Sequence, residues 1–458
     1  MSLTSRNAFI LIAAAVSAAI SALAVFDPMS LASIVVLPGM LLVGIWLWRL
    51  LHGDQTAVVI LLFIAIFMVD AVFRRREATD KSLDFQALMK IGLWALLVVV
   101  SLLNLRKWYH LLILPSNVPG VMFLLWICAT TLTSHVPAYT AVTSFSIMAY
   151  ALGSAYFCNV LKRSDLFGAI VAAITLFCFI SILYYFIIPE YGRYTYWHNK
   201  ELYLSARLAG ISGSANNMGR IASVGLILLA MYAKDFRRYN PLFVPVSALI
   251  MGVALVLTNS RSSLAMVLVL LMMVYAFNAR RFYLLVLAGS AAALLLVLLI
   301  PFADQILTSV ARTGNMEEIT SLTGRTGVWR GVLELSAQKP VAGWGYASSI
   351  FVLPEHEPVV GFYVPHAHNL FLQLLLTTGW TGVILFTLAV LCIGARASFA
   401  RDRTVITLLA IVLLNGIVEA SGFTTLANIC TLAFTIAMFL PPEGIAREDH
   451  PSYQRRFS

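Results

Sequence analysis

Residues 166–188 are LFGAIVAAITLFCFISILYYFII, a run that contains no charged side chain. A helix that crosses a bilayer needs about 20 mostly apolar residues. Its backbone must also be helical, because lipid offers no partners for backbone hydrogen bonds. This run therefore predicts a transmembrane helix, and comparable apolar runs recur along the chain.

The composition indicates that most of the chain lies in a membrane. Hydrophobic residues make up 60% of the sequence and charged residues only 11%, whereas a soluble domain carries about 25% charged residues. We expect an all-α, polytopic integral membrane protein with about 12–14 transmembrane helices. The predicted spans lie near residues 7–26, 31–50, 56–73, 86–104, 118–134, 140–160, 166–188, 215–232, 241–258, 263–278, 282–302, 368–394, 404–419 and 424–440.

The spans divide the chain into five expected segments. These are N-terminal transmembrane helices at 1–115, a transmembrane core with phosphate-binding loops at 116–302, a large periplasmic loop with an amphipathic helix at 303–367, C-terminal transmembrane helices at 368–440, and a cytoplasmic tail at 441–458. The first span is expected to be retained rather than cleaved as a signal peptide, because further spans follow it directly. The five cysteines lie within apolar runs without metal-type spacing, which predicts small buried hydrophobic residues.

The basic residues indicate how the chain is oriented. The net charge is +10, but the basic side chains are scattered through short loops, so nucleic-acid binding is not expected. From residue 160 onward, loops such as 162–163, 280–281 and 396–403 carry Lys and Arg on one side only, which predicts that this side is cytoplasmic. The polar segment 303–367 then faces the periplasm. Arg74–Arg76 contradict this bias, so the topology of the first 115 residues stays open.

Two arginines of the inferred outer face lie in short polar stretches. Arg207 lies in the stretch 205–217, which is rich in Gly, Ser and Asn. The backbone N–H donors of this stretch can approach a ligand. The alternative is a helix cap beside an arginine at the lipid headgroups. Arg261 lies in the turn 259–263, where it can meet a phosphate or simply extend to the membrane surface.

A second pair of arginines accompanies the amphipathic helix expected at about 325–337. Arg325 lies at its start and Arg330 more than one turn later, and the helix could lie flat at the membrane interface. A planar guanidinium binds phosphate oxygens in a bidentate manner, which an ammonium cannot do. Arg325 is therefore a candidate phosphate ligand, and the alternative is a helix that only rests on the surface.

Two histidines, His366 and His368, stand directly before the span at 368–394, followed by Asn369. Histidine is the side chain most easily tuned to accept a proton near neutral pH. A zinc site is a weaker alternative, because no Asp or Cys stands beside the histidines in the sequence, and a structural role is another. We expect a catalytic role for this pair rather than a metal site, and no cofactor.

Taken together, these motifs resemble the O-antigen ligase and polymerase superfamily of bacterial membrane glycosyltransferases. The resemblance covers about residues 205–385 most strongly. It rests on the order and spacing of Arg207 with Gly-Ser-Ala-Asn-Asn (213–217), Thr-Asn-Ser-Arg-Ser (258–262), Gly-Arg-Thr-Gly-Val-Trp (324–329), Lys-Pro-Val-Ala-Gly-Trp-Gly (339–345), His-Ala-His-Asn (366–369) and Leu-Thr-Thr-Gly-Trp-Thr-Gly (376–382).

The resemblance implies a reaction and a location. Such enzymes transfer a glycan from an undecaprenyl diphosphate carrier, without a metal, at the periplasmic face of the bacterial inner membrane. The acceptor is lipid A–core for a ligase and a second carrier-linked glycan for a polymerase; direct displacement would invert the anomeric centre. By motif position, Arg207 and Arg325 hold the diphosphate and His368 is the base, with His366 a weaker candidate.

Three alternatives remain open from sequence. A transporter or flippase of lipid-linked sugars would place ionisable groups within its spans, and Asp70 and Glu419 are the main candidates here. No internal repeat accompanies them, which favours the enzyme. Within the enzyme class the sequence does not separate ligase from polymerase, and glycosylation of a protein acceptor is a third possibility.

Overall fold

The computed structural model describes residues 42–73, 84–198, 201–279, 325–357, 364–419 and 422–442. The predicted spans at 7–26 and 282–302, much of the loop 303–367 and the tail from 443 lie outside these ranges. The chain forms two compact units, Met1–Ile60 and Leu61–Ser458. The first unit contains a helix over 42–51, and Arg49 of this helix forms an ion pair with Asp54 just beyond its end (2.7 Å). The second unit carries the candidate site.

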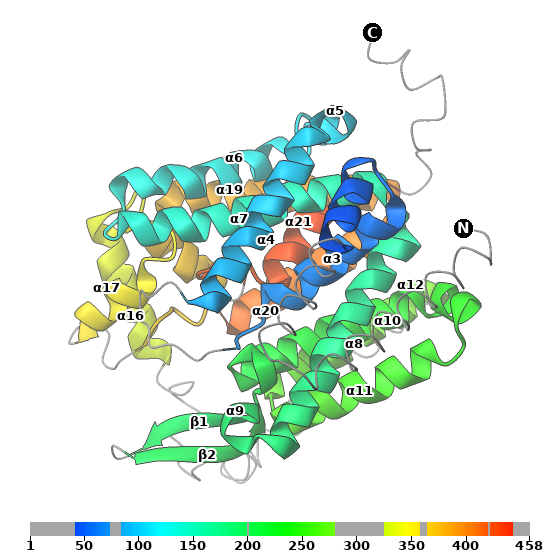
Figure 1. Cartoon of the computed structure of the whole chain (residues 1–458). Coiled ribbons are helices and arrows are strands. Elements are labelled where there is room, and N and C mark those ends of the chain that lie inside the picture. The colour runs from blue at the N-terminus through cyan, green and yellow to red at the C-terminus, as the bar shows by residue number, and fades with distance from the viewer. Residues whose placement is uncertain are drawn as a thin grey trace, which may run out of the picture. The chain divides into compact units, whose positions relative to one another are not determined.

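Helices dominate the described residues, which confirms the all-α membrane class (Figure 1). The α-helices are α3 (Gln55–Val69), α4 (Phe85–Leu103), α5 (Leu105–Trp108), α6 (Val118–Ala129), α7 (Pro137–Val160), α8 (Arg163–Ile187), α9 (Pro189–Gly192), α10 (Ala215–Tyr239), α11 (Phe243–Thr258), α12 (Arg261–Ala279), α16 (Arg325–Gln338), α17 (Ser349–Glu355), α19 (Leu370–Ala400), α20 (Arg403–Val418) and α21 (Ile429–Phe439). Short 3₁₀ turns are η1 (Tyr109–Leu111), η2 (Thr130–Thr133) and η3 (Gly210–Ser212). One antiparallel hairpin, β1 (Arg193–His198) with β2 (Glu201–Leu208), was not expected from the sequence.

The helices of the described residues coincide with the predicted spans to within a few residues. Four of them, α4, α7, α8 and α19, are long and apolar enough to cross a membrane, or up to five spans if 42–51 and α3 form one broken span. Shorter apolar helices include α11, α12, α20 and α21. The prediction of a last span at 424–440 is wrong. The helix found there, α21, has 11 residues, about half the length that a full crossing needs.

Helix α21 forms the buried centre of the second unit. Every one of its residues is buried, and it packs against α7 and α20. Around it, α19 packs against α6 and α20, while α10 packs against α8, α11 and α12. An aromatic cluster of Phe123, Phe386, Phe423 and Phe434 joins α6, α19 and α21.

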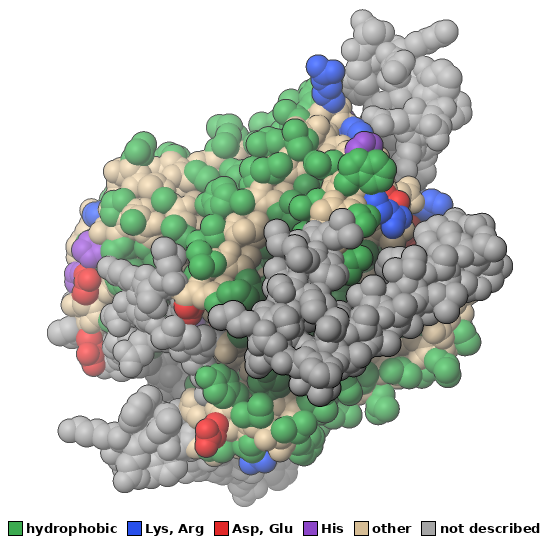
Figure 2. All heavy atoms as spheres, in the orientation of Figure 1, with side chains coloured by type: hydrophobic (Ala, Val, Ile, Leu, Met, Phe, Trp, Pro, Cys, Tyr) green, Lys and Arg blue, Asp and Glu red, His purple; other side chains and the backbone are tan. Residues whose placement is uncertain are grey.

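The surface of the helices is apolar, as expected for contact with lipid. Phe85, Leu103 and Phe399 are 76%, 67% and 90% exposed. In Figure 2, hydrophobic side chains cover the face made by α4, α6 and α7, while charged side chains gather near α5 and near α16 and α17. Monomeric soluble proteins rarely expose so much contiguous apolar surface, so this face fits contact with a bilayer.

A kink in α19 explains two of the glycine-containing motifs. Gly379 interrupts the helix with a left-handed backbone (φ 65°), a conformation that glycine adopts without steric cost. The freed carbonyl groups of Leu376 and Thr377 accept hydrogen bonds from the backbone of Trp344 (2.9 Å) and Gly345 (3.0 Å). The segments 339–345 and 376–382 therefore pack backbone against backbone.

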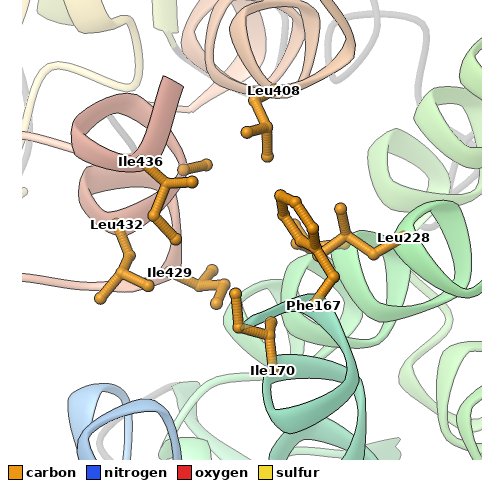
Figure 3. Close-up of a pocket in the computed structure, with 9 residues that line it drawn as sticks. Phe167, Ile170, Leu228, Leu408, Ile429, Leu432 and Ile436 are labelled. Carbon is orange, nitrogen blue, oxygen red and sulfur yellow. The ribbon is translucent and has the colours of Figure 1, made fainter. Parts of the chain in front are cut away.

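A small apolar pocket lies between α8, α10, α20 and α21 (Figure 3). Its lining is hydrophobic throughout: Phe167, Ile170, Val224, Leu228, Leu408, Ile429, Leu432, Ala433 and Ile436. It offers no polar group to orient a sugar or a phosphate, so the candidate site has to be sought elsewhere.

Candidate active site

The site begins in the short connection that leads into α19, where the backbone around His368 is fixed on both sides. Ala367 donates its N–H to the Gln373 side chain (3.0 Å), and its carbonyl accepts from the Trp329 indole (3.0 Å). Asn369 caps α19 by accepting hydrogen bonds from the N–H groups of Phe371 and Leu372. His368 itself has a left-handed backbone (φ 50°), which is uncommon outside glycine. The loop therefore holds His368 in one orientation.

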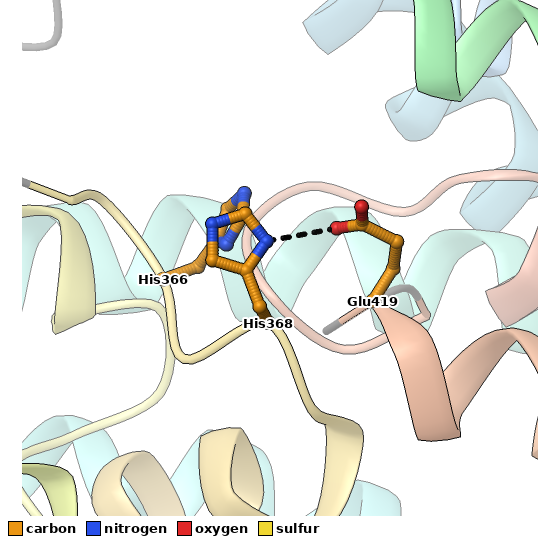
Figure 4. A group of neighbouring side chains, drawn as sticks. All are labelled: His366, His368 and Glu419. Carbon is orange, nitrogen blue, oxygen red and sulfur yellow. Dashed lines mark hydrogen bonds and ion pairs between the residues drawn. The ribbon is translucent and has the colours of Figure 1, made fainter. Parts of the chain in front are cut away.

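The side chain of His368 meets a carboxylate from a distant part of the chain. Its Nδ1 lies 3.1 Å from Oε2 of Glu419, the residue that ends α20 (Figure 4). The two side chains are 24% and 16% exposed, so solvent screens their interaction only partly. A carboxylate at Nδ1 favours the tautomer with the proton on that nitrogen, which leaves Nε2 to accept one.

His366 lies against His368, with ring centroids 4.1 Å apart and the ring planes at 76°. Burial, and then the neighbouring His368, lowers the pKa of His366 to about 4, so this imidazole is neutral at neutral pH. Its Nδ1 is buried and has no hydrogen-bond partner among the described residues. A neutral imidazole with a spare nitrogen can support a proton acceptor but does not add charge.

Glu419 is in turn connected to Arg207. Its second oxygen, Oε1, accepts a hydrogen bond from the Asn216 amide (3.1 Å) in the first turn of α10. The amide oxygen of Asn216 accepts from Nη2 of Arg207 (2.8 Å). A continuous series of hydrogen bonds therefore links the guanidinium of Arg207, through Asn216 and Glu419, to the imidazole of His368.

Arg207 projects from strand β2, whereas the sequence had placed it only in a turn-rich stretch that leads into the next helix. Its Nε donates to the carbonyl of Thr258 (2.9 Å) at the end of α11, and its guanidinium lies 5.6 Å from the centre of the Tyr194 ring on β1. The hairpin is therefore the scaffold that holds this arginine. Its guanidinium is preorganised by three different elements.

A second polar network begins at the next residue of α10, Asn217. Asn217 donates to Asp70 (3.2 Å), and the other oxygen of Asp70 accepts from the N–H of Ile429 at the start of α21. Arg220 donates to Asn217 through Nη2, while its buried Nε has no partner among the described residues. After burial and the neighbouring His368, the positive charge of Arg220 also contributes to lowering the pKa of His366.

The remaining predicted residues are placed less completely. Arg325 begins α16, but its side chain lies outside the described atoms, so its role stays a prediction. Arg261 begins α12 and is exposed, and Arg330 is exposed on α16. Neither of these two is brought into the hydrogen-bond chain. Asn369 acts as a helix cap.

The amphipathic helix expected at 325–337 is confirmed as α16, with one correction. Its apolar residues Val328, Val332 and Leu335 are buried against α17, α19 and the loop before α19, in a cluster with Val352, Leu353, Val364, Ala367 and Leu376. The helix therefore does not lie flat with its apolar face on lipid. It is a fixed wall of the site, and the Trp329 bond to Ala367 ties it to His368.

Sequence reasoning missed three contributors to the site. Glu419 and Asp70 were considered only as features of a transporter, yet both hold site residues. Arg220 was overlooked, although an arginine inside an otherwise apolar helix is a functional signal in a membrane protein. Asn216 belonged to a recognised motif, but its two partners could not be inferred without the fold.

Comparison with known proteins identifies a family over part of the chain. A search of the curated proteins finds no match. Residues 246–387, however, match the family model described as O-antigen ligase. This range includes Arg261, Arg325, His366 and His368, whereas Arg207 precedes it and Glu419 follows it. The resemblance seen in the motifs is thereby confirmed for this part of the chain: residues 246–387 match the O-antigen ligase family, within a chain whose long apolar helices fit a membrane protein.

Proposed function

We propose that this protein transfers a glycan from an undecaprenyl diphosphate carrier to an acceptor hydroxyl at the periplasmic face of the bacterial inner membrane. One observation carries the proposal, the hydrogen-bond chain from Arg207 through Asn216 and Glu419 to His368. It holds a phosphate-binding group and a proton acceptor in one rigid arrangement. Glycosyl transfer from a diphosphate needs both at the same time.

His368 acts as the general base in this proposal. Glu419 holds the Nδ1 proton, so Nε2 accepts the proton of the acceptor hydroxyl as the oxygen attacks the anomeric carbon. The bond from that carbon to the phosphate oxygen breaks, and the diphosphate leaves with the electron pair. A positioned base contributes about 10²–10⁴-fold to such a reaction, and direct displacement inverts the anomeric centre.

The arginines stabilise the departing diphosphate. Arg207 is held by Thr258 and Asn216 before any substrate binds, so little reorganisation accompanies the reaction. Arg325 stands at the N-terminus of α16, where the helix dipole also favours an anion. Arg220 adds a further positive charge close to the histidines, and Arg261 remains a candidate at the first turn of α12. The residues of this chain perform these roles without a metal or a cofactor.

Replacement of His368 by Ala tests the core of the proposal. The variant is expected to lose transfer while it remains folded and inserted, because the base is removed and the cap at Asn369 stays. His110→Ala, a histidine at η1 in the same unit, is the matched control and should transfer at the wild-type rate. Glycan transfer by His368→Ala at an undiminished rate would contradict the assignment.

Arg325→Lys tests the diphosphate clamp separately. Lysine keeps the charge but loses the planar fork that binds two phosphate oxygens. We expect a raised KM for the carrier-linked donor, measured with purified protein in detergent. Full activity of this variant would argue against bidentate binding by Arg325.

The choice between ligase and polymerase depends on the acceptor. Reconstitution with a diphosphate-linked glycan and each acceptor in turn distinguishes them, because a chain-length ladder indicates a polymerase and a single transfer to lipid A–core indicates a ligase. A flippase would instead move the intact donor across vesicles without cleaving it. Asp70 and Glu419, the ionisable groups that favoured a transporter, are bound to Asn217 and His368, which supports the enzyme.

A further inference from the structure

The three ionisable groups at the end of the hydrogen-bond chain are arranged as metal ligands. One ligand atom from each of His366, His368 and Glu419 can be chosen so that all three lie within 4.8 Å of one another. The sequence had argued against a metal because no acidic residue stands near the histidines. The fold supplies that acidic residue from the end of α20.

The closest pair of ligand atoms is spaced as a small divalent ion requires. Zinc binds imidazole nitrogen and carboxylate oxygen at about 2.0–2.2 Å, so two ligands on a tetrahedral ion are about 3.3 Å apart. The Nδ1 atom of His368 lies 3.1 Å from Oε2 of Glu419. The ion would replace the proton that these two atoms share, with little movement of either side chain.

The buried Nδ1 atom of His366 is the second, independent feature. It has no hydrogen-bond partner among the residues that the structure describes, although buried polar atoms nearly always have one. Figure 4 shows its ring behind that of His368. An imidazole nitrogen beside a histidine–carboxylate pair can serve as a third ligand.

The surroundings favour one class of ion. Asn216 holds the other oxygen of Glu419 (3.1 Å), as outer hydrogen bonds orient metal-binding carboxylates in other proteins. Two imidazoles and one carboxylate suit Zn²⁺ and Cu²⁺, whereas Mg²⁺ requires oxygen ligands. The negative charge of Glu419 offsets part of the positive charge of the ion and of the nearby Arg220.

We propose that His366, His368 and Glu419 bind a transition-metal ion such as Zn²⁺, and that this ion inhibits the protein. The bound ion occupies the imidazole and the carboxylate that proton transfer needs, so it acts as an inhibitor and not as a cofactor. Only the inhibition rests on the proposed function. Binding is decided by the geometry of the three side chains alone.

Binding is tested by titrating the full-length protein in detergent with Zn²⁺ in competition with a chromophoric chelator. We expect one high-affinity ion per chain, and a loss of affinity of about tenfold or more in His366→Gln and in Glu419→Gln. His135→Gln is the matched control, because His135 also pairs with a glutamate, Glu355 (2.8 Å), at a separate place on the surface. It should bind Zn²⁺ as the wild type does, and Mg²⁺ should not displace the ion.

Equal affinity in the wild type and in both site variants would overturn the metal site. So would an equal loss in His135→Gln. Thermal unfolding of each variant in detergent verifies that it is folded, and the two site variants give independent measurements.

Inhibition is tested on glycan transfer, with each rate divided by the rate of the same protein in a chelator. Wild-type transfer should fall as Zn²⁺ saturates the site and recover when a chelator is added, while His135→Gln should respond in the same way. Transfer that continues at full rate with the site occupied would overturn the inhibitory role. If the wild type transfers no glycan to any acceptor, the proposed function fails, but the binding titration still decides the metal site.

Discussion

Replacement of Glu419 by Gln separates the role of the carboxylate from that of the histidine it holds. Glutamine has nearly the same shape, but its amide offers one acceptor oxygen in place of two, so it can accept from His368 or from Asn216 and not from both. It removes the negative charge that lies 3.1 Å from the imidazole, together with one of these two hydrogen bonds. During transfer that imidazole becomes positively charged, so the carboxylate stabilises the transition state more than the ground state.

The size of the effect follows from the geometry. Two unit charges at this separation attract by about 5 kcal/mol at an effective dielectric constant of about 20, which is an upper limit because desolvation opposes it. A hydrogen bond to a charged group contributes about 1.5–3 kcal/mol net. Since 1.36 kcal/mol is tenfold in rate, kcat should fall by about 10- to 150-fold.

The assay is transfer from a carrier-linked glycan by purified protein, with kcat and KM measured separately. We expect kcat to fall while the KM for the donor changes little, because the diphosphate ligands are intact. Glu419→Asp keeps the charge and should recover part of the rate. Glu334→Gln, at an exposed position of α16, is the matched control. If Glu419→Gln keeps the wild-type kcat, Glu419 does not assist His368; if kcat and stability fall together in both site variants, its role is structural.

Three further variants test the surrounding structure. In the same transfer assay, Arg220→Gln should raise the KM for the donor by about tenfold. The control Arg238→Gln, at the exposed end of α10, should leave this KM unchanged. If the two variants have the same KM, Arg220 does not belong to the site. Asp402→Ala removes a buried carboxylate that accepts from Arg163 and caps α20. We expect the free energy of unfolding to fall by about 3–5 kcal/mol, measured as a lower unfolding temperature in detergent. Asp402→Asn should lose less stability because it retains the cap. Gly379→Ala places a Cβ against the backbone of segment 339–345 at a left-handed position, so its unfolding temperature should also fall, and an unchanged value would contradict the proposed reason for this glycine.

The length of each apolar run in the sequence was enough to predict the helices. The runs that predicted spans at 140–160 and 166–188 appear as α7 and α8, because a membrane requires each segment to satisfy its own backbone hydrogen bonds. The same reasoning failed for 424–440. Helix α21 is buried within protein, so it is not required to match the thickness of a bilayer.

The hairpin β1–β2 also escaped prediction, since a two-stranded ribbon depends on pairing between strands and on its contacts with the helices. Arg207 was recognised as a site candidate, yet its support by Tyr194, Thr258 and Asn216 comes from that hairpin and from two helices. Polar contacts between distant elements leave no local pattern in a sequence.

The sequence by itself determined that this is a helical membrane protein, that arginine and histidine motifs between the spans are the candidates for its site, and that these motifs resemble the O-antigen ligase family. Local rules suffice for those conclusions, because hydropathy and motif spacing are properties of short segments. Only the tertiary structure decided which carboxylate His368 meets. Glu419 follows it by 51 residues along the chain, and it reaches the imidazole because α19 and α20 pack side by side as an antiparallel pair. His368 could be proposed as the base from the sequence, but the carboxylate that contacts it could not.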